Sequence, residues 1–269
     1  MKPLQVKAVV FDWAGTVIDF GSQAPMGAFV ELFNRHGLSI TIAEARVPMG
    51  MPKWHHIQAL GQQSRIATLW EQIHGRPFSD SDVDALYEEF TPMNAASVVN
   101  HARLIEGTLS TLAWLRARGV RIGSTTGYNR AIMEVVMPLA HAQGFTPENV
   151  VCADDLPESR PSPMGMRHTM ELLGVAHPRH AVKVDDTVPG LLEGRNAGCW
   201  TVAVLASGNA LGLTEAEWLA TGESSRAALR AHARESLSGG QADYFVDTVA
   251  ELPGVIEQIE VRLASTASA

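Results

Sequence analysis

The chain has 269 residues, a formal net charge of -8 at pH 7, and 46% hydrophobic against 19% charged residues. This composition is that of an ordinary globular protein, with one large domain or a domain with a sizeable insertion, and it excludes disordered and collagen-like chains. The acidic excess argues against binding to nucleic acid or to an anionic membrane. No apolar stretch is long enough for a membrane span, and Cys152 and Cys199 lack metal-ligand spacing. We therefore expect a cytoplasmic protein.

Short apolar runs that end in polar or small residues predict buried parallel strands. They lie at residues 8–11, 120–123, 150–153, 181–184, 200–205 and 244–246. Segments of helical periodicity lie between them, at residues 108–118, 129–143, 163–173 and 187–196. Glycine follows three of these segments, as it often does at the end of a helix. This alternation predicts an α/β fold with a Rossmann-like, mainly parallel sheet covered by helices on both faces.

The stretch between the first two predicted strands breaks this alternation. Residues 21–100 carry only helical signals, over residues 24–35, 64–74 and 80–90. We interpret residues 21–100 as an all-helical cap domain, inserted into an α/β core domain made of residues 1–20 and 101–269. A helical cap over an open sheet predicts a two-domain enzyme.

Polar residues follow several of the predicted strands, namely Asp12, Thr126, Asp155 and Asp186. Ligands bind beyond the carboxyl ends of the strands in an open parallel sheet, so we expect these residues to surround one crevice. Asp12 also has small neighbours, and its carboxylate there could attack phosphorus and form an acyl phosphate. A turn or helix-capping aspartate is the alternative interpretation of an isolated Asp in such a place.

Four motifs follow one another in a fixed order along the chain. They are Asp12-Trp-Ala-Gly-Thr16, Ser124-Thr-Thr-Gly127, Arg160-Pro-Ser-Pro163 and Asp185-Asp-Thr187. This series resembles the haloacid dehalogenase superfamily over residues 8 to about 210. The resemblance implies a nucleophile at Asp12, phosphate-binding groups at Thr126, Gly127 and Arg160, and a magnesium site that includes Asp12 and Asp186. Hydroxyl, amide and guanidinium donors suit phosphoryl oxygens, and carboxylates suit Mg²⁺.

One position departs from the phosphatases of that superfamily. These enzymes carry a second aspartate two residues after the nucleophile, which protonates the leaving oxygen, whereas this chain has Ala14. A carbon leaving group would need an electron sink instead, because a bare carbanion is too unstable to expel. An imine formed on a lysine supplies such a sink.

Lys53 is the candidate for that lysine. Only 4 of the 21 basic residues are Lys, and Lys53 is the only one between residues 8 and 182. The Met and Trp residues beside it could desolvate the ammonium and lower its pKa, so that a neutral amine attacks a carbonyl. A solvated surface lysine is the alternative. Lys183 lies within a predicted strand, and we interpret it as structural.

The first and second motifs, together with the cap segment Met49-Gly-Met-Pro-Lys-Trp-His-His56, closely resemble the phosphonoacetaldehyde hydrolase family. The resemblance implies hydrolysis of the carbon–phosphorus bond of phosphonoacetaldehyde to acetaldehyde and phosphate. The reaction would pass through a Schiff base on Lys53 and an aspartyl phosphate on Asp12, with Mg²⁺ as cofactor and His56 as the proton carrier. Homodimers are also implied.

The same resemblance implies a wider set of binding residues. The metal ligands would be Asp12, the Ala14 carbonyl and Asp186. The substrate-binding residues would be Ser22, Met49, Gly50, Thr126, Gly127, Tyr128 and Arg160.

Some positions depart from the family pattern. Asp185 stands where the superfamily usually has Gly, and Gly190 where it usually has Asp, so Asp185 could support the metal site. Ser22 stands where some relatives have Cys.

Two other functions stay open. A magnesium-dependent phosphatase or phosphomutase acting on a phosphate ester is disfavoured by Ala14. A non-catalytic phosphoacceptor module would not need a lysine-bearing cap of about 80 residues.

Overall fold

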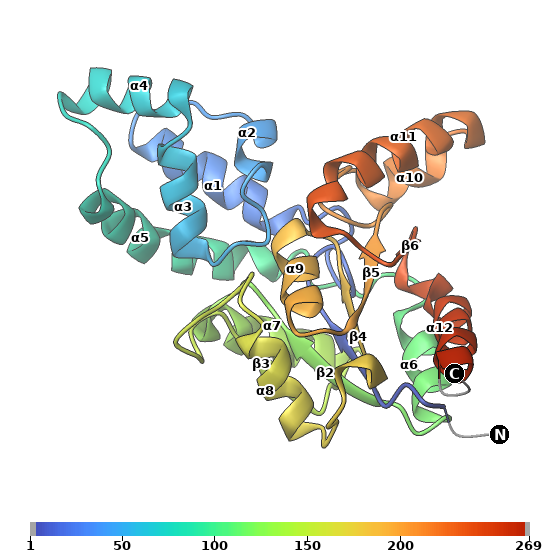
Figure 1. Ribbon diagram of the computed structural model, residues 1–269. Helices are drawn as coiled ribbons and strands as arrows, with labels where there is room; N and C mark the ends of the chain where they lie inside the picture. The colour runs from blue at the N-terminus through green and yellow to red at the C-terminus, as the bar shows by residue number, and fades with distance from the viewer. Residues whose placement is uncertain (1–3, 267–269) are drawn as a thin grey trace.

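The computed structural model of the chain describes residues 4–266. These residues form one sheet of six strands in the order β3-β2-β1-β4-β5-β6 (Figure 1). The strands are β1 (Ala8–Phe11), β2 (Arg121–Thr125), β3 (Asn149–Val151), β4 (Ala181–Asp185), β5 (Trp200–Val204) and β6 (Tyr244–Val246). Every neighbouring pair is parallel, which confirms the predicted α/β, Rossmann-like fold, with strand ends shifted by one or two residues.

The register of the central strand determines where its first polar residue emerges. Phe11 of β1 pairs with Ser124 of β2 on one side and with Val184 of β4 on the other. Asp12 therefore leaves the sheet at the middle of its carboxyl edge, and its backbone amide still donates to the Val184 carbonyl at 3.0 Å. This is the edge at which open parallel sheets bind ligands.

Helices cover both faces of the sheet, and the side chains of β1 show how. Val9 and Phe11 belong to the apolar cluster that includes residues of α6, α7 and α12, whereas Ala8 and Val10 pack with Met166 of α8. A strand buried on both faces has no polar alternation, which explains why its sequence is a short continuous apolar run.

Outside residues 24–98, the described residues form seven α-helices and three short 3₁₀ helices. The α-helices are α6 (Thr108–Arg116), α7 (Arg130–Ala142), α8 (Met164–Leu172), α9 (Val188–Asn196), α10 (Glu215–Ala220), α11 (Glu223–Ser236) and α12 (Leu252–Thr266). The 3₁₀ helices are η1 (Pro178–His180), η2 (Ser238–Gly240) and η3 (Val249–Glu251). The helices α10 to α12 are not among those that the sequence predicts.

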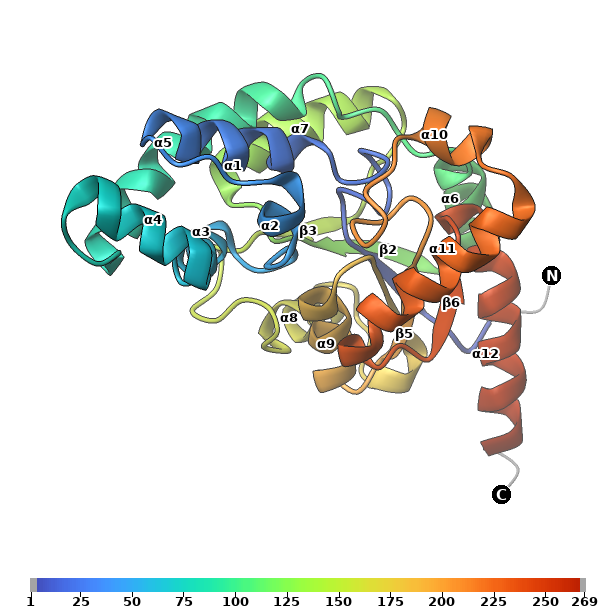
Figure 2. The same ribbon diagram turned by 90° about the horizontal axis from the view of Figure 1, so that it is seen from above.

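Five helices and no strand lie between residues 24 and 98, gathered to one side of the sheet (Figures 1 and 2). They are α1 (Ala24–Arg35), α2 (Ile42–Arg46), α3 (Lys53–Gly61), α4 (Ser64–His74) and α5 (Asp80–Val98). The sequence predicts α1 and α4 at these bounds, misses α2 and α3, and ends α5 eight residues too early. α5 packs against α1 and α3 and also against α7 of the core.

Two segments connect these helices to the sheet, and they lie side by side. Ile18 forms an isolated antiparallel bridge with Leu104, and the Asp19 amide donates to the Arg103 carbonyl at 3.2 Å. The Asp19 carboxylate then accepts hydrogen bonds from the backbone amides of Gln23 and Ala24 at the start of α1, both at 2.9 Å.

Within residues 4–266, no helix combines the length and hydropathy that crossing a bilayer requires.

Candidate active site

A small cavity lies at the carboxyl edge of the sheet, between the sheet and the residues that precede α3. It contains about 310 Å³ of empty space, including its opening to solvent. The residues that line it are Asp12, Ala14, Ser22, Pro25, Met49, Gly50, Lys53, Thr126, Gly127, Tyr128, Arg160 and Thr187. The residues named from the sequence as site residues are among them, except His56, Asp155, Asp185 and Asp186.

Three buried carboxylates meet at the base of this cavity. Oxygens of Asp12, Asp185 and Asp186 lie within 4.8 Å of one another. Burial and the charge of Asp185 raise the pKa of Asp12 to about 6, although Arg160 and Lys183 act in the opposite sense. Burial and the charge of Asp12 raise the pKa of Asp186 well above its ordinary value. A hard divalent cation with oxygen ligands would relieve this repulsion, so the donor set fits a magnesium ion.

The three carboxylates differ in the number of hydrogen bonds and ion pairs that they make with other protein groups. Asp185 accepts hydrogen bonds from the Thr187 amide at 3.0 Å and hydroxyl at 2.7 Å. Burial alone would raise its pKa, but Arg160 and Lys183 outweigh burial and hold the pKa below its usual value. Asp186 takes part in fewer contacts, chiefly one hydrogen bond from the backbone amide of Asn209 to Oδ2 at 2.7 Å. Asp12 and Asp186 are therefore better placed than Asp185 to bind a cation.

Arg160 lies beside the nucleophile candidate and is almost fully buried. Its Nη2 donates to Asp12 Oδ1 at 2.8 Å and to the Thr125 carbonyl at 2.7 Å, and it lies 3.3 Å from Asp185 Oδ2. Its Nε lies 3.3 Å from Glu193 Oε2. These contacts fix the guanidinium next to Asp12, where it can neutralise an anionic phosphoryl group.

Lys183 and Glu193 complete a buried network that sequence reasoning did not identify. The Lys183 ammonium donates to Thr125 Oγ1 at 2.6 Å and lies 3.2 Å from both Asp185 and Glu193. Glu193, on α9, also accepts from Thr125 Oγ1 at 2.6 Å. The signal that could have revealed this network is a lysine inside an otherwise apolar strand, because such a charge needs buried partners.

The departure at the fourth motif has a spatial explanation. A side chain at Gly190 would place its Cβ only 2.0 Å from Asp185 Oδ2. The Asp185 carboxylate thus fills the space beside residue 190. Asp185 contacts Arg160, Lys183 and Thr187. Its support of a metal ion stays a prediction.

Lys53 is the first residue of α3, and it lines the cavity together with Ser22, Met49 and Gly50. Its side chain is 4% exposed, so a solvated surface lysine does not describe it. The ammonium nitrogen lies 3.7 Å from Met49 Sδ, 5.2 Å from the centre of the Tyr128 ring and 5.8 Å from that of Phe29. Burial lowers the pKa of Lys53 to about 8, although Asp12 opposes the shift. A fraction of the amine is therefore neutral near pH 7.

His56 lies one turn further along α3, behind Lys53 and outside the cavity lining. It is fully buried and stacks on Phe29, with ring centres 3.9 Å apart. Its Nε2 is 2.8 Å from the Ala45 carbonyl, while Nδ1 has no hydrogen-bond partner among residues 4–266. Burial and the charge of Lys53 lower the pKa of His56 well below its ordinary value. The ring is therefore neutral, with Nε2 as the donor and Nδ1 as a free acceptor.

The residues after β2 provide the donors of the opposite wall. Thr126 and Gly127 follow the end of the strand directly, and Thr126 Oγ1 accepts from the Tyr128 amide at 3.1 Å. Tyr128 is buried, and its hydroxyl has no hydrogen-bond partner in the part of the chain that the structure describes. Burial and nearby carboxylates raise the pKa of Tyr128 well above its ordinary value, so the phenol stays protonated. From the cap side, Ser22, Met49 and Gly50 face the same space.

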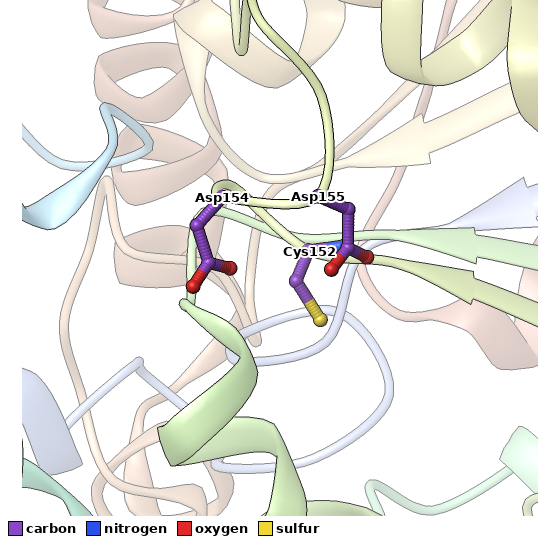
Figure 3. A group of neighbouring side chains, drawn as sticks. All are labelled: Cys152, Asp154 and Asp155. Carbon is purple, nitrogen blue, oxygen red and sulfur yellow. The ribbon is translucent and has the colours of Figure 1, made fainter.

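Asp155 is not part of this site, which corrects the expectation that all four strand-end residues converge. It lies with Cys152 and Asp154 on the loop after β3 (Figure 3). Its carboxylate accepts from the Cys152 amide at 2.7 Å and from Arg130 Nε at 3.2 Å. Burial raises the pKa of the Cys152 thiol to about 12, so the thiol stays protonated near neutral pH. The group is a capped loop with an ion pair.

Comparison with known proteins places the chain in a family. Residues 6–198 match the model of a family described as haloacid dehalogenase-like hydrolase. Phosphonoacetaldehyde hydrolase of Bordetella pertussis is 47% identical over 98% of this chain and 95% of its own. The enzyme of the same name from Paraburkholderia phytofirmans is 48% identical over 96% of this chain and 97% of its own, and that from Vibrio cholerae is 45% identical over 96% of both.

Solved structures give a consistent result. The crystal structure of a phosphonoacetaldehyde hydrolase-like protein from Oleispira antarctica aligns with a TM-score of 0.95 at 41% identity, covering 97% of this chain and 95% of that one. A β-phosphoglucomutase from Clostridium difficile aligns with a TM-score of 0.69 at 16% identity over 97% of this chain and 99% of that one, and so shares the fold alone. The chain therefore belongs to the haloacid dehalogenase-like hydrolases and, within them, to the phosphonoacetaldehyde hydrolase family.

Proposed function

We propose that the chain hydrolyses phosphonoacetaldehyde, breaking its carbon–phosphorus bond to give acetaldehyde and phosphate. The observation that carries the proposal is a buried amine, Lys53, facing the same small cavity as Asp12. Among the described residues, no carboxylate lies within ion-pair distance of this amine. Relatives that are 47% and 48% identical carry the name of this activity.

The first step of the proposed reaction is imine formation on Lys53. The neutral amine adds to the aldehyde carbon, and loss of water leaves a protonated imine. Because burial lowers the pKa of Lys53 to about 8, the nucleophilic form is available near neutral pH. His56, with a free Nδ1 one turn away, is our proposed proton carrier for this step and for the later protonation at carbon.

The second step is attack on phosphorus by the Asp12 carboxylate. As the new oxygen–phosphorus bond forms, the electrons of the carbon–phosphorus bond move into the imine and give an enamine on Lys53. Arg160 beside Asp12, with Thr126 and Gly127 on the facing wall, would stabilise the phosphoryl oxygens. Protonation and hydrolysis of the enamine release acetaldehyde, and water then cleaves the aspartyl phosphate to phosphate and free Asp12.

Magnesium is the cofactor that we propose for this site. Asp12, the Ala14 carbonyl and Asp186 would hold it, and the mutual repulsion of the carboxylates supports an ion there. When bound, the ion neutralises charge between the attacking carboxylate and the phosphoryl group. Residues 21–100 would act as a cap domain over a core of residues 1–20 and 101–269. A homodimeric state and a cytoplasmic location stay predictions.

A comparison of substrates tests this function against the alternatives. Phosphate release is measured with Mg²⁺ present, from phosphonoacetaldehyde and from an alkyl phosphate ester at equal concentration. We expect rapid release from the phosphonate only, because Ala14 offers no acid to a leaving oxygen. Preferential release from the ester would indicate a phosphatase, and stable phosphorylation of Asp12 without turnover would indicate a phosphoacceptor module.

A further inference from the structure

Arg46, the last residue of α2, reaches from the cap to the core. Its Nη1 donates to the Gly21 carbonyl at 2.8 Å and to Asn209 Oδ1 at 2.9 Å. Its Nη2 donates to Gln23 Oε1 and to the Gly212 carbonyl, both at 3.4 Å. Gly21 and Gln23 belong to the segment that leads into α1, and Asn209 and Gly212 to the loop after β5. One guanidinium therefore links α2, the entering segment and a core loop.

The core loop is shaped to receive this side chain. Gly212 has a φ of 59°, and a Cβ there would lie 2.3 Å from Cζ of Arg46. Any other residue at 212 would displace the guanidinium. Arg46 is half-buried, and both terminal nitrogens of its planar guanidinium donate to backbone carbonyl and side-chain amide oxygens. Such surroundings are those of an ordered, hydrogen-bonded side chain and not of a solvated surface cation.

Both ends of the contact lead to the active site. On the core side, the backbone amide of Asn209 donates to Asp186 Oδ2 at 2.7 Å, and Ser207 Oγ donates to the Gly15 carbonyl at 2.8 Å. On the cap side, the Met49 amide donates to the Arg46 carbonyl at 3.0 Å, and Met49 lines the cavity beside Lys53. Arg46 thus lies between the two halves of the site without lining the cavity itself.

We propose that Arg46 is the latch that holds the cap closed over the cavity. It is a positioning residue, which acts through the loop of residues 207–212 on Asp186 and through residues 47–53 on Lys53. The biological purpose of the latch rests on the proposed function, since closure would exclude water from the imine. The closure itself can be measured without any phosphonate.

The test uses the amine itself as the reporter. The full-length enzyme, without substrate, is treated with acetic anhydride, and acetylation of each lysine is followed by mass spectrometry. Lys53 is 4% exposed and reports opening of the cap, Lys183 is fully buried within strand β4 and reports global unfolding, and Lys7 is exposed and calibrates the reagent. Arg46→Gln is compared with Arg65→Gln, which removes a cap arginine that contacts Glu44 and Ser39, both in the cap.

We expect Arg46→Gln to raise the labelling rate of Lys53 about tenfold, because several hydrogen bonds to a charged group are lost. Labelling of Lys183 should not change, and Arg65→Gln should match the parent enzyme. Asn209→Ala removes one acceptor and should give a smaller rise, with little further effect when combined with Arg46→Gln, since both remove the same contact. KM for phosphonoacetaldehyde should rise with the labelling rate.

Two results would overturn the latch. One is an unchanged Lys53 rate in Arg46→Gln, and the other is an equal rise at Lys53 and Lys183, which would mean general loss of stability. If the labelling behaves as expected while the parent enzyme fails to turn over phosphonoacetaldehyde, the latch stands and the proposed function does not. The two conclusions are therefore tested separately.

Discussion

Two buried lysines, one on the cap side of the site and one in the sheet, have opposite surroundings. Lys183 meets a hydroxyl and two carboxylates within 3.2 Å. Lys53 meets a thioether and two aromatic rings, and its pKa is lowered to about 8 by burial. A buried cation with anionic partners is stabilised in its charged form, whereas one without them tends to lose its proton. The comparison separates a structural lysine from a reactive one.

The largest effect should come from replacing the reactive lysine by another cation. Lys53→Arg keeps the charge, but a guanidinium does not form the imine, so phosphate release should fall by at least about a thousandfold, or roughly 4 kcal/mol of transition-state stabilisation. Steady-state kinetics with phosphonoacetaldehyde measures this. Activity within tenfold of the parent enzyme would remove Lys53 from the mechanism.

The structural lysine should instead matter most for folding. Lys183→Met leaves Asp185 and Glu193 buried without one of their partners, and we expect a loss of about 3–5 kcal/mol in the free energy of unfolding. Denaturant unfolding monitored by fluorescence gives the value. A loss below about 1 kcal/mol would mean that Arg160 alone compensates the two carboxylates.

The matched change on the cap side should have the opposite sign. Lys53→Met places an apolar side chain among Met49, Phe29 and Tyr128, and we expect it to stabilise the protein by about 1–3 kcal/mol at pH 7. A lysine whose pKa is lowered from 10.5 to about 8 by folding destabilises the folded state fully below pH 8. The gain should therefore shrink as pH rises from about 8 to 10.5. A gain that does not vary with pH would contradict a depressed pKa.

The smallest expected effect is on the pH dependence of the rate. The neutral form of Lys53 increases up to its pKa of about 8, so kcat/KM for phosphonoacetaldehyde should rise about tenfold per pH unit below that value and then level off. Initial rates between pH 6 and 9 show this profile. A plateau that begins below pH 6.5 would indicate that the amine is not the titrating group.

The sequence predicts most of the sheet and much of the site, for physical reasons that can be named. A strand such as Ala8–Phe11 is buried on both faces, so its apolar run is distinctive, and the following Asp12 must lie at the sheet edge. The short helix α2 was missed because five residues carry little periodicity, although the Thr41–Glu44 capping box marks its start. Another capping box, from Thr214 to Glu217, marks α10.

What the sequence does not predict is the direction in which a strand-end residue turns. Asp155 follows β3 after a turn, and its carboxylate folds back onto the Cys152 amide and Arg130 instead of entering the cavity. Thr125, which accepts a hydrogen bond from Lys183, lies 58 residues away in sequence, so only the fold brings the two together. Contacts of this kind depend on tertiary packing rather than on local pattern.

Trapping with sodium borohydride tests most directly the claim that Lys53 and Asp12 act in sequence on one substrate. Reduction during turnover should leave an ethyl group on Lys53, because the carbon–phosphorus bond is already broken when the acetaldehyde imine is reduced. In Asp12→Ala, the same treatment should leave a phosphonoethyl group on Lys53. Peptide mass spectrometry distinguishes the two adducts. Labelling of any other residue, or no adduct on Lys53 in either protein, would contradict the account.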